Sequence, residues 1–190
     1  MNRPATLLVL LLAGLLAGCG GGSRPTGIRA AETPADDVAE YQPRWRSHTV
    51  DSTQYRKVFL AGTIDMGRSA DWQAALVARF RDSIGGRWLF FNPRRREFHA
   101  SPAGMEYQVA WELAHLEAAD LIVMNLLGDS RSPISLLEMG LYARSGKLFV
   151  ACSPDYYRYD NVRITCRRYG VPLYDSLTAL LDDLPQQSDE

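Results

Sequence analysis

The sequence predicts an α/β protein: a flavodoxin-like three-layer sandwich with a five-stranded parallel sheet. The first observation is that, from Lys57 onward, short apolar segments alternate with longer amphipathic segments, which is typical of a parallel sheet covered on both faces by helices. The second is size, because 190 residues of which 46% are hydrophobic supply one core of ordinary domain size. Right-handed crossovers between such strands favour the flavodoxin-like order, with ligands at the carboxyl ends of the strands.

Each expected element follows from a local pattern. The runs KVFLA, LIVMN and LFVAC are apolar apart from Lys57 and Asn125 at their ends, as strands buried on both faces are. The last helix is indicated by Ser176 as its N-cap and by a leucine stripe behind it. We expect strands at 57–61, 88–91, 121–125, 148–152 and 172–174, and helices at about 71–83, 104–118, 134–145, 160–169 and 176–184.

The sequence predicts an export signal at the N-terminus. Arg3 precedes the apolar run LLVLLLAGLL at residues 7–16, which is too short to span a bilayer as a permanent helix. The following Leu16-Ala17-Gly18-Cys19 resembles the lipobox of bacterial lipoproteins. We therefore expect residues 1–18 to be a lipoprotein signal peptide and Cys19 to be the acylated N-terminus of the mature chain, anchored in a membrane. The alternative is a plain secretory signal in which Cys19 is incidental.

The residue after the cysteine bears on location. Gly20 rather than Asp follows Cys19, which by analogy with lipoprotein sorting predicts the periplasmic face of the outer membrane in the bacterial cell envelope. Residues 19–50 contain a glycine run and several prolines without a sustained period of 2 or 3.6. They are expected to be a flexible tether, with residues 51–190 as the folded domain.

The charge balance limits the partners. The chain has 21 Lys and Arg against 22 Asp and Glu, a formal net charge of −1. No basic field is therefore available for a nucleic acid polymer, and a small molecule is the expected ligand.

A glycine-containing turn follows the first expected strand. Its glycines allow backbone N–H groups to approach a ligand at the start of a helix, although it lacks the spacing of a dinucleotide site and of a P-loop. Asp71 and Trp72 then begin the helix, either as an N-cap with a half-buried ring or as ligand contacts. The candidate substrate-binding residues of this region are Gly62, Thr63, Ile64, Gly67, Asp71 and Trp72.

Asn92 and Arg94 follow the second expected strand within the run NPRRR. They indicate either a solvated basic corner or a contact to an anionic substrate. Glu112 and His115 share one face of a helix, but the chain has only three histidines and no second ligand pair of suitable spacing. We therefore expect no metal and no cofactor.

Glu138 lies in an otherwise apolar helix just beyond the LIVMN strand. The helix dipole is expected to keep its carboxylate ionised, as a nucleophile must be. The alternative is that this carboxylate only stabilises the dipole of its own helix.

A set of motifs in order resembles the nucleoside 2-deoxyribosyltransferase-like family. The resemblance spans Val58 to about Tyr174, and its motifs are VFLAGTIDMG, DWQ, FNPRR, WELAHLEAADLIVM, SPISLLEMGLYARSGK and CSPDYYRYDNVRITCRRYGVP. It implies that Glu138 attacks the anomeric carbon of a nucleoside sugar and forms a glycosyl ester. It also implies that Glu112 holds the sugar hydroxyls and assists proton transfer to the base, although the transferases have Asp at that position.

The resemblance implies several further properties. In related hydrolases of deoxynucleoside monophosphates, the first turn and a serine six residues before the nucleophile hold the 5′-phosphate, and Ser132 has that spacing. The aromatic segment after residue 152 can reach a neighbouring subunit's site in this family, so homo-oligomerisation stays open. Cys152 and Cys166 are expected to be reduced thiols rather than a disulfide.

The sequence thus predicts a lipid-anchored enzyme that cleaves or transfers at the N-glycosidic bond of nucleosides or nucleotides, with transfer and hydrolysis both open. Two alternatives remain: a binding module that captures nucleotide-like ligands without turnover, and a glycohydrolase acting on NAD.

Overall fold

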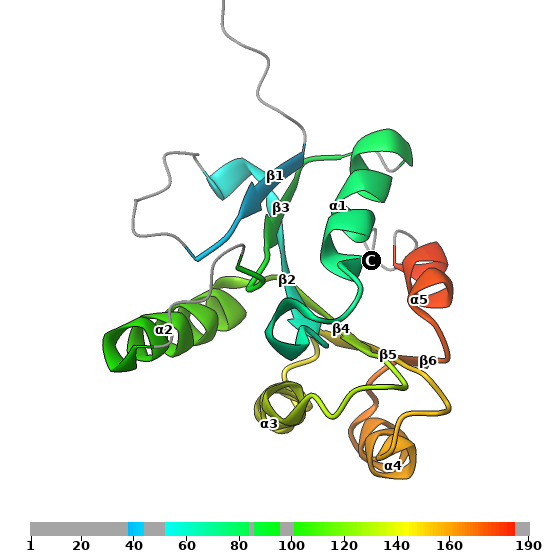
Figure 1. Ribbon diagram of the computed structural model, residues 1–190. Helices are drawn as coiled ribbons and strands as arrows, with labels where there is room; N and C mark the ends of the chain where they lie inside the picture. Colours follow the sequence, from blue (N-terminus) through cyan, green and yellow to red (C-terminus); the bar gives the residue numbers. More distant parts are fainter. Residues whose placement is uncertain (1–37, 44–51, 84–85, 96–100, 185–190) are drawn as a thin grey trace, which may run out of the picture. The chain divides into compact units, whose positions relative to one another are not determined.

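The computed structural model describes residues 38–43, 52–83, 86–95 and 101–184 (Figure 1). The expected export signal, lipidation site and most of the expected tether lie outside these residues. The strands are β1 (Val38–Tyr41), β2 (Arg56–Gly62), β3 (Trp88–Phe91), β4 (Leu121–Leu126), β5 (Leu148–Cys152) and β6 (Leu173–Tyr174). The helices are α1 (Trp72–Ser83), α2 (Pro102–Ala118), α3 (Pro133–Tyr142), α4 (Tyr159–Tyr169) and α5 (Leu177–Asp183), with 3-10 turns η1 (Ser52–Gln54) and η2 (Asp65–Gly67).

All the strands pair in parallel in one sheet of order β1-β3-β2-β4-β5-β6. The predicted α/β class with an all-parallel sheet is confirmed, and without β1 the strand order is the one found in flavodoxin-like folds. The prediction of five strands was wrong, because β1 adds a sixth strand beside β3, with Val38 opposite Trp88 and Tyr41 opposite Phe91. This strand comes from residues that the composition assigned to the tether.

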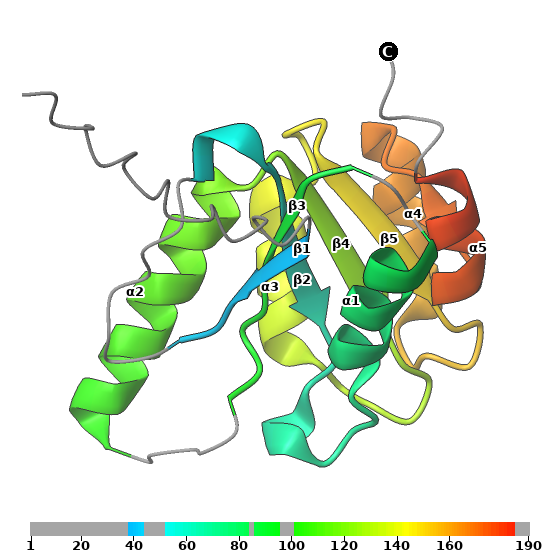
Figure 2. The same cartoon turned by 90° about the horizontal axis from the view of Figure 1, so that it is seen from above.

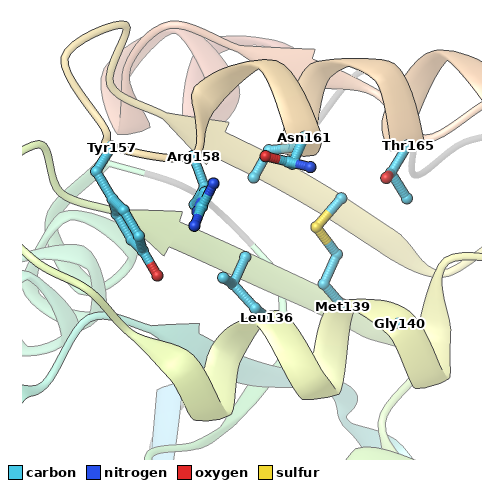
Figure 3. A pocket seen from close by; sticks show the side chains of 8 residues that line it. Leu136, Met139, Gly140, Tyr157, Arg158, Asn161 and Thr165 are labelled. Atoms are coloured by element: carbon cyan, nitrogen blue, oxygen red, sulfur yellow. The ribbon is translucent and has the colours of Figure 1, made fainter.

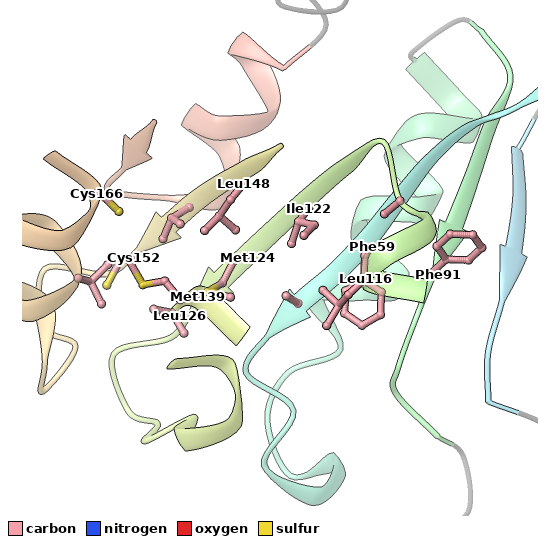
Figure 4. Packing of buried hydrophobic residues seen from close by; sticks show 14 of the residues in the cluster. Phe59, Phe91, Leu116, Ile122, Met124, Leu126, Met139, Leu148, Cys152 and Cys166 are labelled. Carbon is pink, nitrogen blue, oxygen red and sulfur yellow. The ribbon is translucent and has the colours of Figure 1, made fainter. Parts of the chain in front are cut away.

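Helices cover both faces of the sheet (Figure 2). On one face, α2, α3 and α4 pack against a core that includes Phe59, Met124 and Met139 (Figure 4). On the other face, α1 and α5 pack against a second core that includes Leu60 and Phe80. The two cores arise because successive residues of each buried strand point to opposite faces.

Cys152 ends β5 and Cys166 lies on α4, and Figure 4 shows both within the first core. They are free thiols, as the sequence led us to expect. Burial raises the pKa of the Cys152 thiol to about 12 and that of Cys166 to about 11, so both are inert as nucleophiles at neutral pH.

No helix within the described ranges is long and apolar enough to cross a membrane.

Candidate functional site

The candidate site lies where the strand order reverses, between the carboxyl ends of β2 and β4. The backbones of β2 and β4 approach each other closely there. Gly62 has φ +124°, and a Cβ on it would stand 2.2 Å from the backbone oxygen of Asn125. The next residue, Thr63, donates its N–H to that same oxygen at 2.9 Å. Only glycine fits this position, which brings the turn after β2 against the loop after β4.

Three buried hydroxyl groups meet at this edge. Thr63 Oγ1 is 2.8 Å from the Oγ atoms of both Ser130 and Ser132, which are 2.9 Å from each other. The backbone of Leu127 completes the arrangement, since its N–H donates to Thr63 Oγ1 and its oxygen accepts from Ser130. We call Thr63, Ser130 and Ser132 the hydroxyl triangle. It joins the β2 turn to the loop before α3.

Ser132 is the residue from which α3 begins. Its backbone is left-handed, with φ 39° and ψ 54°, and Pro133 occupies the first helical position. Its hydroxyl bonds within the hydroxyl triangle rather than to the first turn of α3, as far as the described residues show. The N-terminus of α3, with its partial positive charge, therefore adjoins the hydroxyl triangle.

The turn after β2 is fixed by its own side chains. Asp65, Met66 and Gly67 have positive φ values of 47°, 54° and 82°, so two non-glycine residues adopt a conformation that costs free energy. The Trp72 indole donates to the Thr63 oxygen at 2.8 Å, and its ring is buried. Trp72, the first residue of α1, therefore fixes the turn through this hydrogen bond.

The remaining residues predicted for this turn are placed as follows. Asp71 accepts from the N–H of Ala74 at 3.0 Å, as an N-cap does. Ile64 is half-buried and accepts from the Ser69 hydroxyl, whereas Gly67 is exposed. Contact of these residues with a substrate stays a prediction.

Asn92 and Arg94 are both buried, and protein atoms occupy their polar groups. Asn92 donates to Glu40 of β1 at 2.7 Å and accepts from the N–H of Arg94. The Arg94 guanidinium donates to Gln73 at 3.1 Å and to the backbone oxygen of Ala70 at 3.0 Å. Their predicted contact with a substrate stays a prediction. In the structure Arg94 holds the segment before α1, and Asn92 links β1 to the backbone of Arg94.

Glu138 lies on α3 with its side chain directed inward, and the residue is 8% exposed. Burial and, to a lesser extent, the nearby charge of Glu112 together raise its pKa to about 8. The expectation that the helix dipole keeps this group ionised was therefore wrong for the unliganded protein. The physical reason is position, because Glu138 is the sixth residue of α3 and the dipole acts within the first turn.

Glu112 reaches the same place from α2, and its pKa is also raised by burial. Two neighbours oppose this rise: Gln108, which donates a hydrogen bond to Glu112 Oε1, and the positive charge of Arg95. The charge of Glu112 contributes to the raised pKa of Glu138, so α2 and α3 place the two predicted catalytic carboxylates within electrostatic range of each other.

This arrangement suits acid–base and nucleophilic chemistry. Two carboxyl groups in a shared, poorly solvated place cannot both ionise easily, so one of them holds a proton at neutral pH. A carboxylate beside a carboxylic acid is the combination that glycosidic bond cleavage requires.

His115 belongs to an aromatic cluster. Its ring stacks on Trp111 at a centroid distance of 4.0 Å and meets Phe91 edge-on at 4.6 Å, and Nδ1 bonds to the Trp111 oxygen. Within the described ranges, no group of three His, Cys, Asp or Glu side chains could hold a metal ion.

A groove of about 340 Å³ lies apart from the carboxylates, between α3 and α4 (Figure 3). Leu136 and Met139 line it from α3, and Arg158 and Asn161 line it from the start of α4. Its lining residues include neither Glu112 nor Glu138.

Sequence reasoning missed two members of the site. Ser130 could have been found from its place two residues before Ser132, after the carboxyl end of a buried strand. Gln108 could have been found from its spacing of four residues before Glu112 on one helix, which brings the two side chains into contact.

Comparison with known proteins agrees with this site. A family model described as nucleoside 2-deoxyribosyltransferase like matches residues 55–156, which is more than half of the chain. The matched range includes β2 to β5, the hydroxyl triangle and both carboxylates. A search among curated proteins finds no significant match.

Proposed function

The chain belongs to the nucleoside 2-deoxyribosyltransferase-like family, and from this premise we propose that it cleaves or transfers at the N-glycosidic bond of deoxynucleosides or their 5′-monophosphates. Glu138 is the nucleophile, and Glu112 moves the proton. The observation that carries the proposal is the pair of electrostatically coupled carboxyl groups on α2 and α3.

The chemistry follows from the pair. A carboxylate oxygen of Glu138 bonds to the anomeric carbon while the bond to the base breaks and its electrons go to the base nitrogen. Glu112 donates a proton to the base as it leaves, so that no negative charge builds up on the base. Water or a second base then attacks the glycosyl ester, and Glu112 takes the proton that this attacking group loses. Water gives hydrolysis, and a base gives transfer.

The test is base release by the full-length chain from a panel of deoxynucleosides and their 5′-monophosphates, with and without an added acceptor base. Glu138→Gln is expected to abolish release, and Glu112→Gln to lower it by about 10²-fold or more, as loss of a general acid does. Glu106→Gln is the matched control, because Glu106 is an exposed carboxylate on the same helix as Glu112. Equal activity of Glu138→Gln and Glu106→Gln would rule out the assignment of the nucleophile.

The hydroxyl triangle supports a 5′-monophosphate as substrate. The Ser130 proton goes to the Leu127 oxygen, and the Leu127 N–H donates to Thr63. Thr63 can therefore donate to Ser132, and the Ser132 proton, which then has Ser130 as its acceptor within the triangle, can turn to a phosphate oxygen beside the N-terminus of α3.

A pair of matched substrates tests this point. Ser132→Ala is expected to lower kcat/KM for the monophosphate by about tenfold, the loss of one hydrogen bond to a charged group, with a smaller effect on the nucleoside. Equal losses for both substrates would count against phosphate recognition by Ser132.

We also propose that the chain is a lipoprotein anchored through Cys19, on the strength of the apolar run at residues 7–16 and the Leu-Ala-Gly-Cys motif after it. Mass spectrometry of the protein from the envelope fraction is expected to show an acylated N-terminal Cys19, and Cys19→Ser is expected to leave the membrane fraction. An unmodified secreted product would refute the proposal.

A further inference from the structure

The side-chain amide of Gln108 lies next to Glu112 and also bonds to Pro93 and Arg95. Gln108 lies one turn before Glu112 on α2, and its Nε2 donates both to Glu112 Oε1 and, at 3.1 Å, to the backbone oxygen of Pro93. Its Oε1 accepts from Arg95 Nε, and Arg95 also donates to the Gly104 oxygen at 3.0 Å. The amide thus uses both of its N–H groups and its oxygen.

The orientation of this amide is set without reference to Glu112. A guanidinium group can only donate, so Arg95 requires the amide oxygen on its side. A backbone carbonyl can only accept, so Pro93 requires the NH₂ group on the other. Glu112 therefore always meets an N–H donor, which favours an ionised carboxylate oxygen over a protonated one.

Glu138 has different surroundings. It is buried on α3, and among the described residues the ionisable groups that act on it or feel its charge are Glu112 and Tyr142, neither of which is a cation. Glu112 is coupled to Glu138 and feels the positive charge of Arg95, and His115 lies one turn further along its own helix. The two carboxyl groups therefore differ in the partners that stabilise a negative charge.

We propose that Gln108, held by Arg95 and Pro93, is a positioning residue that keeps Glu112 as the ionised member of the pair in the unliganded enzyme, so that the pair enters the reaction with one proton, on Glu138. This inference rests on the proposed function and adds to it the protonation state from which the reaction starts.

The reaction requires the pair of carboxyl groups to hold one proton when it starts. This proton passes from Glu138 to Glu112 when the substrate binds, which frees the Glu138 carboxylate to bond to the anomeric carbon. Glu112 then gives the proton to the departing base and is again ionised. When water attacks the ester, its hydroxyl bonds to the anomeric carbon, its proton goes to Glu112, and the Glu138 carboxylate is released. The pair has regained its single proton.

The test is an NMR titration of the Glu carboxyl carbons in the full-length chain labelled with ¹³C, with Glu112 and Glu138 assigned from Glu112→Gln and Glu138→Gln. In the unsubstituted protein Glu112 is expected to ionise at lower pH than Glu138. In Gln108→Leu the Glu112 pKa is expected to rise by about one pH unit, because a hydrogen bond to a charged group is lost. Glu106→Gln is expected to change neither titration.

Activity provides the second readout. The low-pH limb of kcat/KM is expected to move upward in Gln108→Leu by the same amount as the Glu112 titration. If Gln108→Leu does not fold, Arg95→Gln takes its place in the test. This variant lets the amide turn and is expected to raise the Glu112 pKa. Ionisation of Glu138 before Glu112 in the unsubstituted protein would overturn the inference, and so would folded Gln108 or Arg95 variants with an unchanged Glu112 titration. Carboxyl groups that titrate as expected in a protein that releases no base would instead refute the proposed function.

Discussion

The substitution Glu138→Gln is expected to stabilise the protein while it abolishes activity. Glu138 keeps a proton in the folded protein until about pH 8, whereas in the unfolded chain it loses that proton near its ordinary value of 4.5. Between these values the folded state binds more protons than the unfolded state, so the free energy of unfolding falls as pH rises. Glutamine has nearly the same shape and no charge, and it removes this dependence.

The magnitude follows from the two pKa values. Each pH unit between them costs about 1.4 kcal/mol, so the native carboxyl group costs nothing near pH 4.5, about 3 kcal/mol at pH 7 and up to about 5 kcal/mol at pH 8. The residue is only 8% exposed, so solvent screens this cost little. At pH 7, Glu138→Gln is therefore expected to raise the free energy of unfolding by about 3 kcal/mol.

The assay is urea unfolding of the unsubstituted protein, Glu138→Gln and Glu106→Gln at pH 5, 6, 7 and 8. The gap between Glu138→Gln and the unsubstituted protein is expected to open steadily with pH, and the exposed Glu106 is expected to show no such gap. If the curves of Glu138→Gln and the unsubstituted protein run parallel across this range, the carboxyl group is ionised in both states and the reasoning fails.

Three further outcomes are expected. Gly62→Ala should destabilise the fold by several kcal/mol, on the order of the larger core substitutions, because the added Cβ would lie 2.2 Å from the Asn125 oxygen; a cooperative urea transition at an unchanged midpoint would contradict this. Cys152 and Cys166 should resist iodoacetamide at pH 8 in the folded protein and react in urea, so mass spectrometry that finds both alkylated without denaturant would show that the core opens. Thr63→Val should cost about 1–3 kcal/mol in chemical unfolding, since the backbone N–H that donates to its hydroxyl loses its acceptor; an unaffected midpoint would mean that water replaces that hydroxyl.

The continuous apolar runs made most of the fold predictable. The strands expected at 88–91 and 148–152 have the observed bounds. The other three differ by one residue at an end: β2 is longer by one residue at each end, β4 is longer by one at its carboxyl end, and β6 begins one residue later. β1 could not be predicted in the same way. Its four residues, VAEY, have too little pattern of their own, and their partner strand begins fifty residues later, at Trp88. Such a strand is specified by its pairing rather than by its own sequence.

The candidate site was predictable in its members more than in its electrostatics. Family motifs identified Glu112 and Glu138, and the structure brings them together. The state of Glu138 depends on how deeply α3 is buried and on the approach of α2, which are properties of packing and not of spacing along the chain. Asn92 shows the same limit, because its amide bonds to Glu40 in a strand that the sequence did not predict.

The sixth strand has a consequence for solubility. β3 consists of Trp-Leu-Phe-Phe, and all four residues are buried. If the sheet ended at β3, an uncharged aromatic strand with open backbone groups would lie at its edge, and such edges pair with other chains and aggregate. β1 covers β3 along its whole length and presents in its place a strand of four residues that includes Glu40. A chain shortened to begin at residue 51 would keep both carboxylates and expose that edge, and it is therefore expected to aggregate more readily than the longer chain.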